Sequence, residues 1–130
     1  MARILLITHG ELGKAFITVI KEMLKKPVAV ELLSFFPDQK QDDFSNELKK
    51  AMDQYEPSEE ILILTDLFGG TPSNMAIPYL EQNRVEVITG VNLAMLLHLV
   101  TGNQSKSFAE LCQSAKSAGV DSVVRAGEFL

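Results

Sequence analysis

Four short apolar runs mark the chain, and amphipathic stretches separate them. The runs cover residues 4–7, 28–33, 61–64 and 85–88, and they are rich in leucine and β-branched residues. Because they are short and nearly uninterrupted, they are typical of strands buried on both faces of a sheet. The valines of Val120–Val124 predict a further short strand near the C-terminus.

The stretches between the runs predict helices. Apolar residues recur at helical spacing from Leu12 to Leu24, ahead of Pro27, and a weaker stripe runs from Phe44 to Tyr55. Residues 92–100 are apolar on all sides, which indicates a helix covered on more than one face. Residues 107–110, Ser-Phe-Ala-Glu, match a capping box and predict another helix start.

Strands that alternate with helices imply right-handed βαβ units and a mainly parallel sheet. We therefore predict a doubly wound α/β fold with the flavodoxin-like strand order 2-1-3-4, in which the first and third strands are neighbours. In such a sheet, ligands bind beyond the carboxyl ends of the strands, where the winding reverses. The residues just after positions 7 and 64 are thus the ones to inspect for chemistry.

Composition narrows the function. The 130 residues fit one domain, residues 1–130, and a net charge of −5 without a Lys/Arg cluster argues against nucleic acid and anionic membrane partners. No apolar run approaches a bilayer span of roughly 20 residues, so no membrane insertion is expected. The lone Cys112 suits a reducing compartment, and we expect a cytoplasmic protein. The sequence has no Cys/His cluster for a metal and no phosphate-loop motif for a nucleotide cofactor.

The predicted strand order brings His9 and Asp66 together, because each follows one of the two neighbouring strands. A neutral imidazole is a usable nucleophile, and its second nitrogen can donate to a carboxylate. That bond selects one tautomer and favours the positive charge that develops during attack. Each residue alone is also typical of an ordinary hydrogen-bonded loop, so the hypothesis depends on the pair.

Residues 69–74, Gly-Gly-Thr-Pro-Ser-Asn, predict a phosphate-binding turn. Gly69 and Gly70 permit close approach of another group to the backbone. Thr71 is expected to cap a helix whose first residue is Pro72, and such an N-terminus suits a phosphate. The side chains of Thr71, Ser73 and Asn74 could add donors. Together with His9 these are the parts of an in-line phosphoryl transfer without a metal. Pro78 is expected to kink or split that helix.

These motifs resemble a known family. The Thr-His-Gly at 8–10, the run at 66–74 and Thr-Gly-Val-Asn-Leu-Ala-Met-Leu at 89–96 are similar to enzyme IIA of the mannose class (mannose/fructose/sorbose), a component of the bacterial phosphoenolpyruvate-dependent sugar phosphotransferase system. The resemblance implies a protein-to-protein phosphotransferase in which His9 accepts phosphate from HPr at Nε2 and passes it to enzyme IIB. Asp66 would hold Nδ1. It also implies a homodimer that exchanges the strand near residues 120–124, and coupling to a membrane sugar permease.

Other functions share some of these features. The phosphotransfer subunit of a dihydroxyacetone kinase has the same fold and histidine, although the long 69–74 loop favours the mannose class. A regulatory phosphohistidine-binding module is a second alternative. Residues 8–11, Thr-His-Gly-Glu, also resemble the Arg-His-Gly-Glu of histidine phosphatases, but Thr8 stands where that family has its phosphate-binding arginine.

Overall fold

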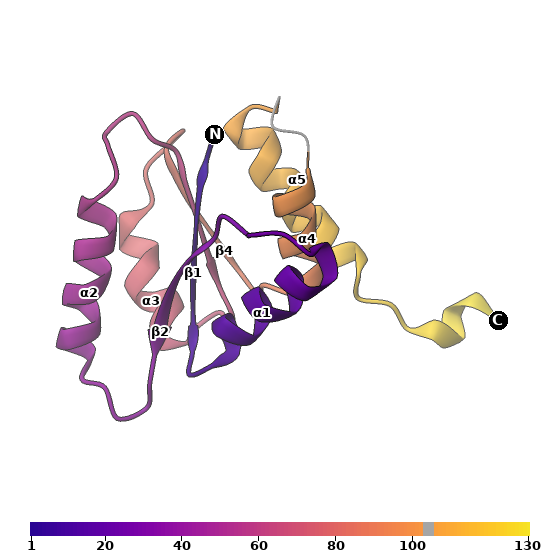
Figure 1. Ribbon diagram of the computed structural model, residues 1–130, viewed down its shortest axis with the longest axis horizontal. Helices are drawn as coiled ribbons and strands as arrows, with labels where there is room; N and C mark the ends of the chain where they lie inside the picture. Colours follow the sequence, from indigo (N-terminus) through magenta and orange to yellow (C-terminus); the bar gives the residue numbers. More distant parts are fainter. Residues whose placement is uncertain (103–105) are drawn as a thin grey trace.

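The computed structural model describes residues 1–102 and 106–130, and within them it forms one sheet of four parallel strands in the order β2-β1-β3-β4 (Figure 1). The strands are β1 (Arg3–His9), β2 (Glu31–Phe35), β3 (Ile61–Thr65) and β4 (Val85–Thr89). The helices are α1 (Leu12–Leu24), α2 (Gln41–Asp53), α3 (Thr71–Ala76), α4 (Leu93–Thr101) and α5 (Phe108–Asp121), with short 3-10 helices η1 (Ile77–Tyr79) and η2 (Ala126–Phe129). The predicted α/β class and strand order are confirmed.

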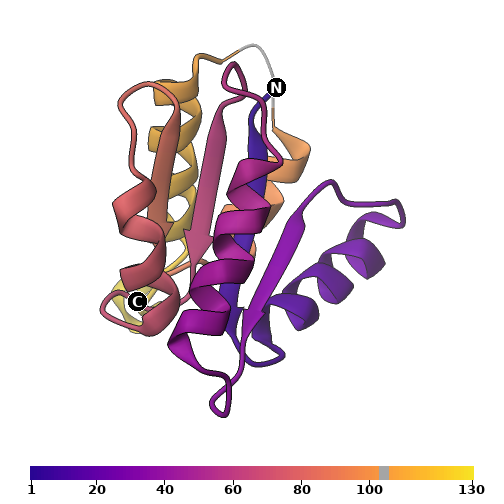
Figure 2. The same cartoon turned by 90° about the vertical axis from the view of Figure 1, so that its left-hand side faces the viewer.

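Helices cover both faces of the sheet, as Figures 1 and 2 show, with α2 and α3 on one side and α1, α4 and α5 on the other. Alternate residues of each central strand enter the two cores. Leu5 and Ile7 pack with Phe44 of α2, whereas Leu6 packs with Ile20 of α1. All five are buried. Because both faces need apolar side chains, the central runs have no polar alternation. None of the helices in the described chain is long and apolar enough to span a bilayer.

Two boundaries differ from the sequence prediction. Strand β2 begins at Glu31, three residues after the start of the apolar run, and ends at Phe35, two residues after the end of the run, because pairing with β1 starts opposite Leu5. Val28 and Val30 instead pack as a loop against the core beneath α1. The interruption by Pro78 is confirmed, since α3 ends at Ala76 and the chain continues as η1.

The predicted strand at Val120–Val124 is wrong in its first two residues, and residues 122–124 form no strand within the single chain that the structure describes. Val120 lies in α5, which continues to Asp121, and residues 122–125 carry no strand in the part of the chain described. The helix extends this far because Gly119 packs closely on α4, where an added Cβ would lie 2.7 Å from Cε of Met95. Beyond α5 the chain projects away from the body of the molecule (Figure 1). A strand needs a neighbouring strand to satisfy its backbone, and within the single chain described no strand pairs with these residues.

Candidate functional site

His9 and Asp66 meet at the carboxyl ends of β1 and β3. The Nδ1 atom of His9 lies 2.9 Å and 3.1 Å from the two carboxylate oxygens of Asp66, and the backbone N–H of His9 donates to Oδ2 at 3.0 Å. The Asp66 side chain is 9% exposed and that of His9 is 43% exposed. The carboxylate is therefore enclosed while part of the imidazole faces solvent.

This contact determines which ring nitrogen is free. An ionised carboxylate only accepts hydrogen bonds, so Nδ1 of His9 must carry the proton that it shares with Asp66. In the neutral ring, Nε2 then keeps its lone pair and is the nucleophilic atom. The ring of Phe35 contacts His9 edge-on, with 6.1 Å between ring centroids, and restricts its rotation. The arrangement leaves one oriented ring nitrogen with a free lone pair at the end of the sheet.

Gly70 lies directly against the imidazole. A Cβ on Gly70 would be 2.8 Å from Cε1 and 3.3 Å from Nε2 of His9, so only glycine leaves the ring in place. The backbone of Gly70 is extended, with φ −77°. Its neighbour Gly69 serves a different purpose, because it has φ +87° and open space where a Cβ would stand. Close approach thus explains Gly70, and backbone conformation explains Gly69.

We predict that Gly70→Ala displaces the His9 ring with little loss of stability. Alanine fits the backbone at Gly70, and the clash falls on the end of a rotatable side chain, so the free energy of unfolding should stay within about 1 kcal/mol of wild type. The Nδ1–H tautomer of His9, measured by imidazole ¹⁵N NMR, should lose its dominance. The matched variant Gly69→Ala should keep the tautomer and lose about 1 kcal/mol of stability. An unchanged tautomer in Gly70→Ala would contradict the assigned role.

The 69–74 turn differs in detail from the prediction. Gly70, rather than Thr71, is the N-cap of α3, so Thr71 opens the helix and Pro72 is its second residue. The side-chain amide of Asn74 donates to the Gly69 carbonyl at 3.2 Å and closes the turn.

The sequence predicts that the Ser73 hydroxyl can donate to a phosphate. In the structure this side chain is fully buried, and its hydroxyl donates to the Leu67 carbonyl at 2.6 Å. Its hydroxyl proton is thus used inside the protein.

Two exposed apolar side chains beside the site were not singled out from the sequence. Leu67 is 60% exposed and Phe68 is 74% exposed, and both follow Asp66 directly. The sequence could have identified them, because two large apolar residues stand between a strand end and a Gly-Gly pair, where turns usually carry polar residues. Exposed apolar groups next to a reactive side chain are typical of a surface that docks another macromolecule.

The Gly-Val-Asn motif at 90–92 has a structural role. The Val91 N–H donates to the Thr65 carbonyl at 3.0 Å, which ties the end of β4 to the end of β3. Asn92 caps α4 by accepting from the Met95 N–H at 2.9 Å, and its amide donates to the Gly119 carbonyl of α5 at 3.0 Å. The other histidine, His98, is partly buried and bonds Ser114 at 3.1 Å, away from His9.

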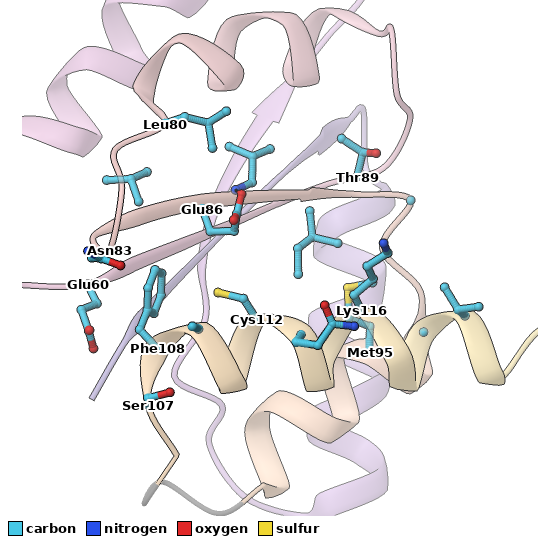
Figure 3. Close-up of a pocket in the computed structure, with 18 of the residues that line it drawn as sticks. Glu60, Leu80, Asn83, Glu86, Thr89, Met95, Ser107, Phe108, Cys112 and Lys116 are labelled. Atoms are coloured by element: carbon cyan, nitrogen blue, oxygen red, sulfur yellow. Dashed lines mark hydrogen bonds between the residues drawn. The ribbon is translucent and has the colours of Figure 1, made fainter.

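A groove of about 1120 Å³ lies between β4 and α5, along the edge of the sheet (Figure 3). Phe108, Cys112 and Lys116 line it from α5, and Glu86 and Thr89 line it from β4. Burial raises the pKa of the Cys112 thiol to about 12, so the thiol is protonated and unreactive at neutral pH.

Among the residues that the structure describes, no cluster of His, Cys, Asp or Glu could hold a metal ion.

A known family model covers most of the chain. Residues 3–116 match the family model EIIA-man, described as the PTS system fructose IIA component. The chain is 30% identical over 82 residues to the fructose-specific EIIA component of Bacillus subtilis (strain 168), covering 62% of this chain and 56% of that protein. It is 26% identical over 118 residues to the mannose-specific EIIAB component of Escherichia coli (strain K12), covering 89% of this chain and 36% of that protein. The chain therefore spans 56% and 36% of the length of these two relatives.

A solved structure gives the same fold. The mannose/sorbose specific IIA subunit of the phosphotransferase system from Enterococcus faecalis superposes with a TM-score of 0.86, at 20% sequence identity. The superposition covers 95% of this chain and 93% of that subunit. At this level of identity, the likeness concerns the fold.

Proposed function

The chain belongs to the EIIA-man family of phosphotransferase-system components, and on that basis we propose that it is a phosphocarrier that accepts phosphate on His9 from HPr and transfers it to enzyme IIB. The contact between Nδ1 of His9 and the Asp66 carboxylate carries this proposal. It leaves the lone pair of Nε2 free on a side chain that is 43% exposed, where a partner's phosphohistidine can reach it.

The transfer step follows from this geometry. Nε2 of His9 attacks the phosphorus atom in line, forming a P–N bond, while the bond from phosphorus to the donor's histidine nitrogen breaks and its electron pair stays on that nitrogen. The imidazole of His9 gains positive charge, which the Asp66 carboxylate stabilises through Nδ1–H. In the second transfer His9 is the donor: an acceptor side chain of enzyme IIB forms the new bond to phosphorus while the P–Nε2 bond breaks and its electron pair returns to Nε2.

The turn at residues 69–74 is proposed to hold the phosphoryl oxygens. Gly70 keeps a side chain out of the space beside Nε2, Gly69 supplies the positive φ of the turn, and Thr71, which is half-buried, stands at the start of α3. The side chain of Asn74 is exposed at the same turn. Ser73 stabilises the shape of this turn instead of binding the phosphoryl oxygens, because its hydroxyl donates to the Leu67 carbonyl. Leu67 and Phe68 give the two partners an apolar surface to dock on in turn.

We place residues 1–130 in the cytoplasm as one phosphotransferase domain, coupled to a membrane permease for a sugar of the mannose, fructose or sorbose class. The test is incubation with phosphoenolpyruvate, enzyme I and HPr, followed by intact-mass measurement. We expect one added phosphate that is lost in acid, as a phosphohistidine is. An unmodified chain in the presence of phosphorylated HPr would overturn the proposal.

We further propose that the protein is a homodimer in which the chain beyond α5 of one copy adds to the edge of β4 in the other. Among the described strands, β4 pairs only with β3. Its outward groups are partly covered, because Val85 pairs with Glu81 and the Val87 N–H donates to the Glu86 carboxylate at 2.9 Å. Val123 and Val124, 81% and 56% exposed, supply β-branched side chains for a strand that needs a partner.

The prediction is that deleting residues 123–130 gives a folded monomer. The deletion removes the exposed Val123, Val124 and Phe129 but leaves α5 and both cores intact. Light scattering should then report half the wild-type mass. As a matched control, Met23→Glu changes a side chain of α1 that is 57% exposed outside the groove, and it should leave the mass unchanged. A monomeric wild type, or a dimeric deletion variant, would contradict the proposed exchange.

A further inference from the structure

Two buried hydroxyl groups flank the backbone of Asp66 and take no part in the proposed chemistry. Thr65 is the last residue of β3, and Ser73 lies in the first turn of α3. Both side chains are fully buried, and their oxygens are 2.6 Å apart. Because a buried polar group must be hydrogen-bonded to avoid a cost in stability, this pair specifies how strand, turn and helix fit together.

The hydrogen bonds of this pair run in one direction. Ser73 has one hydroxyl proton and donates it to the Leu67 carbonyl at 2.6 Å. The Thr65 hydroxyl must therefore donate to Ser73 Oγ. The Leu67 carbonyl also accepts from the Gly70 N–H at 3.1 Å, which links the same bonds to the glycine beneath His9. The chain of bonds thus runs from Thr65 through Ser73 to Leu67.

Asp66 is the residue between the two ends of this chain. The Thr65 carbonyl is held by the Val91 N–H at 3.0 Å, so the backbone is bound on both sides of Asp66. Its carboxylate must meet two groups of His9 at once, the backbone N–H and Nδ1. Such a double contact tolerates only small shifts, since hydrogen bonds weaken steeply when their angles change.

We propose that the Thr65 and Ser73 hydroxyls act as positioning residues for the phosphoryl acceptor: they fix the backbone of Asp66, and Asp66 in turn holds His9 with Nε2 unprotonated. This inference rests on the proposed function for its effect on transfer, but its structural consequence is independent of any partner. Neither residue touches the imidazole. Their effect passes entirely through Asp66.

The test compares hydroxyl-deleting and hydroxyl-keeping variants. Thr65→Val keeps the shape and removes the donor, Thr65→Ser keeps the donor, and Ser73→Ala removes the relay. We expect Thr65→Val and Ser73→Ala to lower the fraction of His9 in the Nδ1–H tautomer, seen by ¹⁵N NMR of the unphosphorylated protein. Phosphorylation by HPr should slow by about tenfold or more. Thr65→Ser should stay close to wild type in both measurements.

Ser114→Ala is the matched control for the two hydroxyl-deleting variants. Ser114→Ala removes a partly buried hydroxyl that contacts His98 and the Leu111 carbonyl, and it should leave the His9 tautomer and the transfer rate unchanged. If Ser73→Ala does not fold, Ser73→Cys keeps a side chain of similar shape with a weaker donor, and we expect the same changes at smaller size. Folded Thr65→Val and Ser73 variants with a wild-type tautomer would overturn the inference. Absence of wild-type phosphorylation would instead overturn the proposed function, while the tautomer measurement would still test the positioning role.

Discussion

Replacement of His9 by alanine is expected to abolish phosphorylation, a loss of at least about a thousandfold, because it removes Nε2, the proposed attacking atom. The fold should survive, since the side chain is 43% exposed and lies outside both apolar cores. The backbone N–H at position 9 can still donate to Asp66. The measurement is the rate of phosphate incorporation from HPr, with thermal unfolding as the check on folding.

His98 provides the matched control for this variant. The sequence contains two histidines, and His98 is bonded to Ser114 in a separate part of the molecule. His98→Gln should therefore be phosphorylated at the wild-type rate. Retention of an acid-labile phosphate in His9→Ala, or its loss in His98→Gln, would move the acceptor away from His9 and contradict the assignment.

The change of Asp66 to asparagine is expected to slow phosphorylation by roughly 10² to 10⁴-fold while leaving the acceptor in place. Asparagine has nearly the same shape, but its amide turns a donor toward Nδ1 of His9 and removes the negative charge. The tautomer with the proton on Nε2 is then favoured, and that proton blocks the attacking lone pair. The developing positive charge on the ring also loses its counter-charge.

Rate and tautomer should change together in Asp66→Asn. Transfer kinetics from phosphorylated HPr give the first, and imidazole ¹⁵N shifts give the second. Glu22→Gln removes a carboxylate from an exposed position on α1 and should change neither. Transfer at the wild-type rate in Asp66→Asn would show that Asp66 does not orient the histidine, even if His9 is the acceptor.

The two largest predictions depend on residues that the sequence already placed together. The uninterrupted apolar runs identified β1 and β3, because strands buried on both faces require apolar residues at every position. The rules of parallel βαβ topology then put the ends of these strands side by side, which joined His9 to Asp66, 57 positions later in the chain. Both steps use local patterns and general topology, so no knowledge of packing was needed.

Two helix boundaries differ from those that the local sequence pattern predicts. The valines of 120–124 have strand propensity, yet Val120 is helical because Gly119 lets α5 pack on Met95 of α4. Thr71 and Pro72 matched a cap and a first helical residue, yet the helix begins one residue earlier, because the extended Gly70 already turns the chain beneath His9. In both places a contact between segments overrode a local preference.

The fold class, the strand order and the meeting of His9 with Asp66 could thus be predicted from the amino-acid sequence, since these follow from hydrophobic periodicity and chain connectivity. The role of each polar group of the turn became clear only from the packing of the folded chain. Ser73 was indistinguishable from Thr71 and Asn74 as a candidate donor, yet its hydroxyl points inward to Leu67 and Thr65. The reason is that a hydroxyl's partner depends on how α3 packs against the end of β3, and distances between packed segments are not encoded in any local pattern.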